Sequence, residues 1–216
     1  MTRGQIRWSR VSRITRAVLA LTFGSLVLGW GGAEAELLTG LTSTGNLVTF
    51  DSGTPGTIGS SVAISGLLST ETLLGIDRRP ATGILYGLGS SSRLYTINTT
   101  TGLAAAVGGP FSPALSGTAF GFDFNPVPDR IRVVSTDTTN FRLNPNDGTL
   151  AGTDTPLSYA FGDSGAGLTP RVVGSAYSNN FDGTVVTTLF GIDSNRDVLV
   201  MQQTRNPDSR EGPSGP

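Results

Sequence analysis

Three aspartates follow the same short motif and are the first residues in this sequence that could do chemistry. Leu74-Gly-Ile-Asp77, Phe120-Gly-Phe-Asp123 and Phe190-Gly-Ile-Asp193 each place a carboxylate after an apolar-Gly-apolar triplet. Carboxylates at equivalent repeat positions can line a channel, bind a cation or act as an acid–base pair. A carboxylate beside a strand more often accepts backbone N–H bonds and caps a turn, and this is the interpretation we favour.

The residue types that are missing restrict the chemistry further. The chain has no Cys and no His, so thiol nucleophiles, thiolate metal sites and an imidazole base are excluded. Glycoside hydrolysis needs only two carboxylates, which makes Asp77 and Asp123 the candidate catalytic pair of an alternative hypothesis, a carboxylate-dependent glycan hydrolase. The prediction that we favour is a protein with no catalytic residue and no cofactor.

One segment matches the start of a calcium-binding loop. Asp193, Asn195 and Asp197 have the spacing of the first three ligands, but Val198 stands at the glycine position and Thr204 at the position of the bidentate glutamate. We therefore favour an Asx turn between two strands over a metal site.

Residues 1–35 have the pattern of an export signal. An apolar run of 14 residues, from 17 to 30, precedes the small-x-small sequence Ala33-Glu-Ala35. The run is shorter than the ~20 residues that span a bilayer. Although a retained membrane anchor is the alternative, we predict a Sec-type signal peptide cleaved before Glu36. The protein would then be extracytoplasmic, either periplasmic or secreted, without a stable membrane anchor. The basic residues before the run are Arg3, Arg7, Arg10, Arg13 and Arg16.

The charge of the chain argues against nucleic acid as a partner. The precursor has a net charge of −1 from 15 basic and 16 acidic residues. Removal of residues 1–35 takes away five arginines and one glutamate, so the mature chain is acidic. Its arginines are scattered along the sequence, whereas a nucleic-acid surface has them clustered.

Short β-rich runs separated by Gly, Pro, Asn and Asp predict an all-β fold, and their repetition predicts a propeller-like array of antiparallel sheets. Asp77 and Asp123 are 46 residues apart, and so are Asn98 and Asn144, each of which follows a strand-like run. Leu47-Val-Thr-Phe-Asp51 is an earlier copy of that second motif. A step of about 46 residues fits one four-stranded blade. The predicted strands include 47–50, 84–86, 94–97, 131–134, 185–190 and 198–200.

The spacing of the repeated motif changes toward the C-terminus. Asp193 follows Asp123 by 70 residues, which predicts a long loop between Gly148 and Ala176. Residues 205–216 are polar with three prolines, and we predict a disordered tail there. The expected organisation is thus a signal peptide (1–35), a β-repeat domain (36–204) and a tail (205–216), with the array of sheets either incomplete or open.

Several longer sequence segments, or phrases, resemble those of a known family. These phrases are residues 71–77, 79–83, 85–89, 93–98, 120–126 and 129–134. With them, the stretch from Leu37 to Met201 resembles a bacterial exported domain of unknown function, number 4394. The resemblance implies an extracytoplasmic, propeller-like β domain without an assigned activity. The repeat pattern stops after Met201, where the family continues, so a truncated, non-functional fragment is a further alternative.

These observations together favour a binding or interaction module whose partner is an envelope or extracellular glycan, or a protein. Six aromatic residues could form a sugar-stacking surface, although we favour a place for them between the sheets, because large aromatic side chains are usually buried. They are Tyr86, Tyr95, Phe122, Phe124, Phe141 and Tyr177.

Overall fold

The computed structural model describes residues 35–203, and every regular element within that range is a β-strand. The predicted C-terminal tail, and the predicted signal peptide apart from Ala35, lie outside the described residues. Within residues 35–203, no helix is long and apolar enough to cross a membrane.

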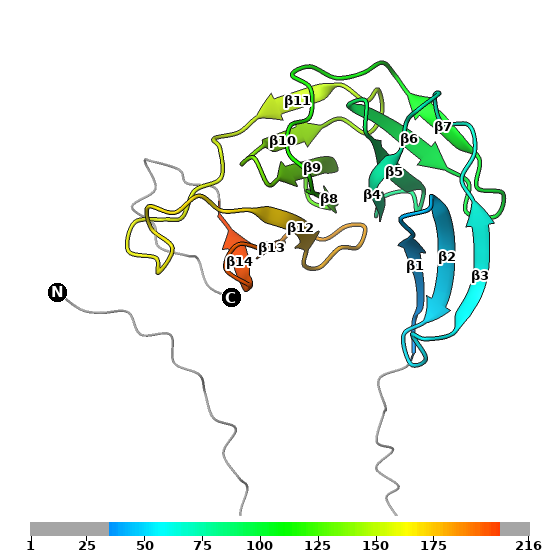
Figure 1. Ribbon diagram of the computed structural model, residues 1–216, viewed down its shortest axis with the longest axis horizontal. Helices are drawn as coiled ribbons and strands as arrows, with labels where there is room; N and C mark the ends of the chain where they lie inside the picture. The colour runs from blue at the N-terminus through cyan, green and yellow to red at the C-terminus, as the bar shows by residue number, and fades with distance from the viewer. Residues whose placement is uncertain (1–34, 204–216) are drawn as a thin grey trace, which may run out of the picture. The chain divides into compact units, whose positions relative to one another are not determined.

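Within residues 35–203, fourteen strands form four antiparallel sheets, and each sheet is a run of consecutive strands (Figure 1). Sheet 1 contains β1 (Leu37–Leu41), β2 (Asn46–Asp51) and β3 (Ile58–Ala63). Sheet 2 contains β4 (Leu73–Arg78), β5 (Leu85–Gly89), β6 (Arg93–Ile97) and β7 (Ala104–Val107). Sheet 3 contains β8 (Phe120–Asn125), β9 (Arg130–Ser135), β10 (Asn140–Leu143) and β11 (Leu150–Thr153). Sheet 4 contains β12 (Val172–Tyr177), β13 (Leu189–Asp193) and β14 (Val198–Gln202).

The sheets follow one another like the blades of a propeller, which confirms the predicted fold class. The first strands of sheets 2, 3 and 4 are neighbours, since β4 lies beside β8 and β8 lies beside β12. Figure 1 shows these strands toward the centre of the arc and the later strands β7 and β11 on its outside. We call β4, β8 and β12 the inner strands.

The 46-residue repeats mark equivalent strands. Asp77 and Asp123 lie on the inner strands β4 and β8, and the second motif lies at β6 and β10, the third strands of their sheets. The earlier copy of the second motif, Leu47-Val-Thr-Phe-Asp51, lies on β2. Sheet 1 therefore corresponds to the second, third and fourth strands of a blade. Sheet 4 begins with an inner strand and corresponds to the first three.

The predicted third copy of the aspartate motif is wrong. Residues 190–193 lie on β13, the second strand of sheet 4, rather than on an inner strand. The inner strand β12 has Val173-Gly-Ser-Ala176 at the equivalent position. β12 thus has the glycine of the motif, but Ala176 stands in place of the aspartate. The interval of 70 residues from Asp123 to Asp193 joins an inner strand to the second strand of another sheet, so it is not a repeat interval.

Two further predictions need correction. The strand predicted at 185–190 begins only at Leu189, and Val185 and Val186 lie exposed in the preceding loop. The long loop predicted between Gly148 and Ala176 is shorter than expected, because β11 and β12 occupy its two ends and only 154–171 is irregular.

The core lies between the sheets. Tyr86 of sheet 2 packs edge-to-face on Phe124 of sheet 3, with ring centroids 5.2 Å apart. A second cluster joins Leu47 of sheet 1 to Leu85 and Tyr95 of sheet 2. All the candidate aromatic residues except Tyr177 are buried. The predicted core position is therefore confirmed for five of the six.

The glycine of the repeated motif lies at a close contact with the next sheet in sheets 2 and 3. A Cβ atom on Gly121 would lie 2.5 Å from Ser175 Oγ and 2.7 Å from Val134 Cγ2, whereas one on Gly174 would have no atom within 4 Å. The glycine is therefore needed at position 121, where sheet 4 comes close, and not at position 174, where no described atom lies within 4 Å of the added Cβ.

We expect Gly121→Ala to lower the free energy of unfolding by about 1–3 kcal/mol, because the added methyl overpacks the contact between sheets 3 and 4. Gly174→Ala is the matched control and should be neutral or slightly stabilising, since it reduces backbone freedom in open space. Urea unfolding of both variants checks this, and equal losses would contradict the close approach.

Candidate functional site

Asp77 connects sheet 2 to sheet 3. Its Oδ2 atom accepts a hydrogen bond from the backbone N–H of Phe124, at 2.7 Å. Phe124 lies on β8, which pairs with β9 along one edge and has no strand on the other. The carboxylate therefore supplies an acceptor to an amide at the unpaired edge of an inner strand.

Asp123 repeats this bond one sheet further on. Its Oδ2 atom accepts from the backbone N–H of Tyr177 on β12, at 2.6 Å. Phe124 directly follows Asp123, and Tyr177 directly follows Ala176, so both aspartates bind the same position of the next sheet. We call each of these bonds a carboxylate link.

The two linking aspartates are also close enough for each to affect the pKa of the other. Burial, followed by the negative charge of Asp77, raises the pKa of Asp123 to about 8. Burial also raises the pKa of Asp77, although its bonds with the Phe124 and Arg78 backbone and with Asp123 oppose that rise. At neutral pH, Asp123 is therefore mostly protonated, which removes the repulsion between the two carboxylates.

This pair has one property of a catalytic dyad. A carboxyl group with a pKa near neutrality can act as a general acid. However, Asp77 and Asp123 each accept a hydrogen bond from a backbone amide of the next sheet, so both carboxylates already have a structural partner.

The candidate calcium ligands lie in and next to the turn between β13 and β14. The Asp193 side chain is fully buried, and its Oδ1 atom accepts from the backbone N–H of Asn195 at 2.8 Å, which makes the predicted Asx turn. Burial would raise the pKa of Asp193, but hydrogen bonds from the Tyr159 hydroxyl and the Asn195 amide outweigh it and lower that pKa. Asp197 lies in the same turn with a φ of 52°. Across residues 35–203, no three or more acidic side chains gather in a group that could hold a metal ion.

A second link between sheets was not predicted from the sequence. Arg79 and Asp129, in the turns that follow β4 and β8, form a bidentate ion pair. The Asp129 carboxylate raises the pKa of the Arg79 guanidinium. Both residues fall within phrases of the family resemblance, but a distance of 50 residues in sequence gives no local signal that they meet.

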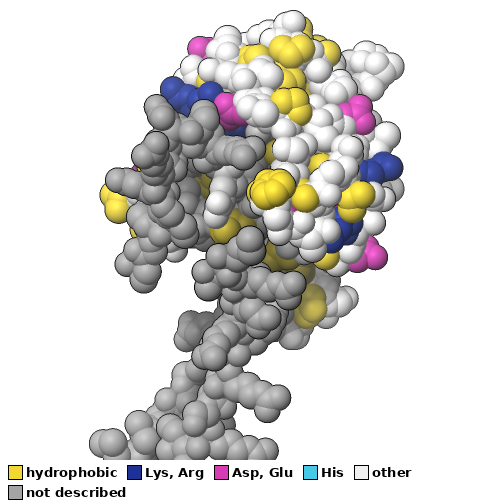
Figure 2. Space-filling view, turned by 90° about the vertical axis from the view of Figure 1, so that its left-hand side faces the viewer, with side chains coloured by type: hydrophobic (Ala, Val, Ile, Leu, Met, Phe, Trp, Pro, Cys, Tyr) yellow, Lys and Arg dark blue, Asp and Glu magenta, His cyan; other side chains and the backbone are white. Residues whose placement is uncertain are grey.

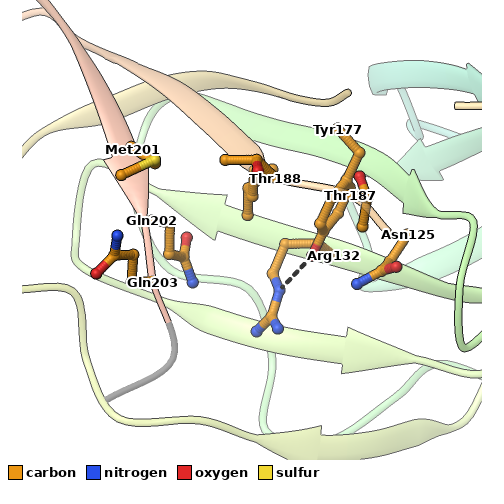
Figure 3. A pocket seen from close by; sticks show the side chains of 9 residues that line it. Asn125, Arg132, Tyr177, Thr187, Thr188, Met201, Gln202 and Gln203 are labelled. Carbon is orange, nitrogen blue, oxygen red and sulfur yellow. Dashed lines mark hydrogen bonds between the residues drawn. The ribbon is translucent and has the colours of Figure 1, made fainter. Parts of the chain in front are cut away.

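A pocket of about 290 Å³ lies between sheets 3 and 4. Figure 3 shows Arg132 at its centre, with Tyr177 and Asn125 on one side and Gln202 on the other. Tyr177 is the only one of the six candidate aromatic residues in its wall. The full lining is Asn125, Arg132, Tyr177, Thr187, Thr188, Leu189, Met201, Gln202 and Gln203.

Polar contacts hold the pocket arginine in place. Arg132 Nε donates to the Tyr177 hydroxyl at 3.4 Å, and Arg132 Nη1 donates to Asn140 and to the carboxylate of Asp154. Gln202 of sheet 4 donates to the same Asn140 side chain at 3.1 Å. Asp154 also pairs with Arg142, so one carboxylate serves two guanidinium groups. The pocket therefore presents amide, hydroxyl and guanidinium groups.

The described surface shows no clustering of basic side chains on the side drawn in Figure 2, where blue and magenta side chains are interspersed.

We expect Asp77→Ala to lower the free energy of unfolding by about 1–3 kcal/mol, because the Phe124 amide loses its acceptor. Asp77→Asn keeps a carbonyl oxygen at that place and should lose clearly less. Urea unfolding at pH 5 compares the two variants, and an equal loss would argue against the carboxylate link.

The raised pKa of Asp123 predicts a pH dependence of stability. Between its unfolded value near 4 and its folded value of about 8, the folded state holds a proton that the unfolded state has lost. The free energy of unfolding should therefore fall as the pH rises from 5 to 8, by roughly 3 to 4 kcal/mol. The carboxyl groups with lowered pKa values act at lower pH, and the chain has no His or Cys to titrate in this window.

Asp123→Asn serves as the test, since it keeps the hydrogen bonds but removes the titration. Its stability should be nearly constant between pH 5 and 8 in chemical unfolding. A variant with the same pH slope as the unmodified chain would show that Asp123 is not the group responsible.

The chain resembles solved structures only distantly. The protein described as "BBS1N in complex with ARL6DN, soaked with mercury" is 12% identical with a TM-score of 0.39, over 74% of this chain and 44% of that one. A structural genomics protein of unknown function from Bacteroides thetaiotaomicron VPI-5482 is 14% identical with a TM-score of 0.47, over 76% of this chain and 43% of that one. The chain therefore spans less than half the length of either protein.

No curated protein matches the chain. A family model matches residues 46–211, most of the sequence, and its description is "Domain of unknown function (DUF4394)". The chain belongs to this DUF4394 family.

Proposed function

We propose that this chain is an extracytoplasmic, non-catalytic binding module, exported by the signal-like segment at residues 1–35. The ligand site in this proposal is the pocket between sheets 3 and 4. The sequence supports export through the arginine-rich start, the short apolar run and the Ala33-Glu-Ala35 sequence.

The observation that carries the proposal is the separation of carboxylates from the pocket. Asp77 and Asp123 are engaged by backbone amides of neighbouring sheets, and neither lines the pocket. The lining offers hydrogen-bond donors and acceptors without a carboxylate that could act as acid or nucleophile. Such an arrangement binds and orients a ligand without transferring a proton to it.

The chemistry of the lining favours a glycan as the ligand. Amide groups of Asn125, Gln202 and Gln203 both donate and accept hydrogen bonds, as the hydroxyl groups of a sugar require. Tyr177 adds an aromatic side chain.

A glycan array with the purified chain, followed by calorimetry on any hit, tests the proposal. We expect Gln203→Ala to weaken binding by about fivefold to thirtyfold, because an exposed pocket amide with a ligand bond contributes roughly 1–2 kcal/mol. Asn180→Ala, at an exposed residue outside the pocket, is the control and should bind normally. If neither substitution weakens binding, the ligand site lies outside this pocket.

A carboxylate-dependent glycan hydrolase is the second candidate, and the pKa of about 8 for Asp123 is the observation in its favour. This candidate predicts turnover of a glycan that Asp77→Asn and Asp123→Asn both abolish. Our proposal predicts no turnover with or without these substitutions. The truncated-fragment alternative predicts instead that the purified chain unfolds without a cooperative transition.

A further inference from the structure

One face of sheet 4 is apolar and exposed. Ile192 of β13 and Leu199 of β14 are directly opposite each other in the strand register. The two side chains are 54% and 71% exposed. Phe190 lies on the same face, since residues two apart on a strand point the same way. We call Phe190, Ile192 and Leu199 the open face of sheet 4.

In sheets 2 and 3, the corresponding face packs against the next sheet. Gly174 pairs with Ile192, just as Gly75 pairs with Leu88 and Gly121 pairs with Val134. Gly75 and Gly121 are crowded by Phe122 and Ser175 of the following sheets, whereas Gly174 has open space. Sheet 4 therefore has a face built like a packing face, and no described residue covers it at Gly174.

The open face differs from the others at the linking position. Ala176 stands where Asp77 and Asp123 stand in sheets 2 and 3, so this face offers no carboxylate link. A surface that packs on the open face of sheet 4 must therefore have no inner-strand amide that needs an aspartate as its acceptor.

Sheet 1 has a face that meets this requirement. Leu47 points toward sheet 2, and the alternation of side chains therefore places Val48 and Phe50 on the opposite face. Leu38 and Ile58 pair with Phe50 and share that face, with Ile58 53% exposed. In the described chain, sheet 1 corresponds to the second to fourth strands of a blade, so it presents no inner-strand amide.

We propose that the open face of sheet 4 packs against the Leu38–Phe50–Ile58 face of sheet 1 in a second copy of this chain. Figure 1 shows sheets 1 and 4 at the two ends of the arc, so each copy has one face of each kind to offer. Two identical contacts close a symmetric dimer. Together the two copies supply eight sheets, within the range of roughly four to eight blades in propellers.

The contact continues the packing that already exists within the chain. The interfaces between sheets 1 and 2, 2 and 3, and 3 and 4 are all made by faces of consecutive sheets. The proposed interface repeats this arrangement with an apolar face on each side. The proposed interface needs no carboxylate link, because sheet 4 has Ala176 in place of the linking aspartate and sheet 1 presents no inner-strand amide.

Sedimentation velocity on the purified full chain, from about 1 to 100 μM, tests the proposal. We expect a dimer that Leu199→Lys converts to monomer, with at least a tenfold increase in the dissociation constant. Phe161→Lys is the control, since Phe161 is 96% exposed and lies in the 154–171 loop, outside the strands of sheets 1 and 4. Urea unfolding verifies that the variants remain folded.

Complementary charges distinguish this contact from other modes of association. Leu38→Glu alone should also weaken the dimer, and a mixture of the Leu38→Glu and Leu199→Lys chains should associate more tightly than either chain alone. Two results would overturn the proposal. One is a chain that stays monomeric at 100 μM, and the other is a dimer that neither substitution weakens.

Discussion

An inner strand of a propeller-like sheet has one edge without a strand partner, and the amides along that edge need another acceptor. In this chain, an aspartate on the inner strand of the preceding sheet provides it. Asp77 does so for Phe124 and Asp123 for Tyr177. The bond satisfies a backbone group and fixes the spacing of consecutive sheets, so the packing of the core residues between them depends on it.

The same bond positions the candidate ligand site. Asp123 holds the backbone of Tyr177, and the hydroxyl of Tyr177 accepts from Arg132 in the wall of the pocket. The two carboxylates lie near each other because the inner strands converge, and burial then leaves one of them protonated. The raised pKa of Asp123 is thus a consequence of joining sheets through consecutive carboxylates, and it does not require a catalytic role.

Much of the fold could be predicted from the sequence because turn residues and repeat spacing are local signals. The equivalence of Asp77 and Asp123 is an example, since both motifs lie at the same place on inner strands. The third copy was misplaced because Asp193 reproduces the motif by chance, whereas the true position has Ala176. The pocket and the pair Arg79–Asp129 depend on contacts between distant segments, which no local pattern contains. Turn capping was the correct interpretation for Asp193, but Asp77 and Asp123 bind amides of another sheet.

Amide hydrogen exchange at Phe124 and Tyr177, followed by NMR, measures the carboxylate links most directly. If the links exist, both amides are protected as strongly as those of the paired strand β9, although they face an edge with no strand partner. In Asp77→Ala, Phe124 should lose that protection while Tyr177 keeps it. Rapid exchange at both amides in the unmodified chain would contradict the account.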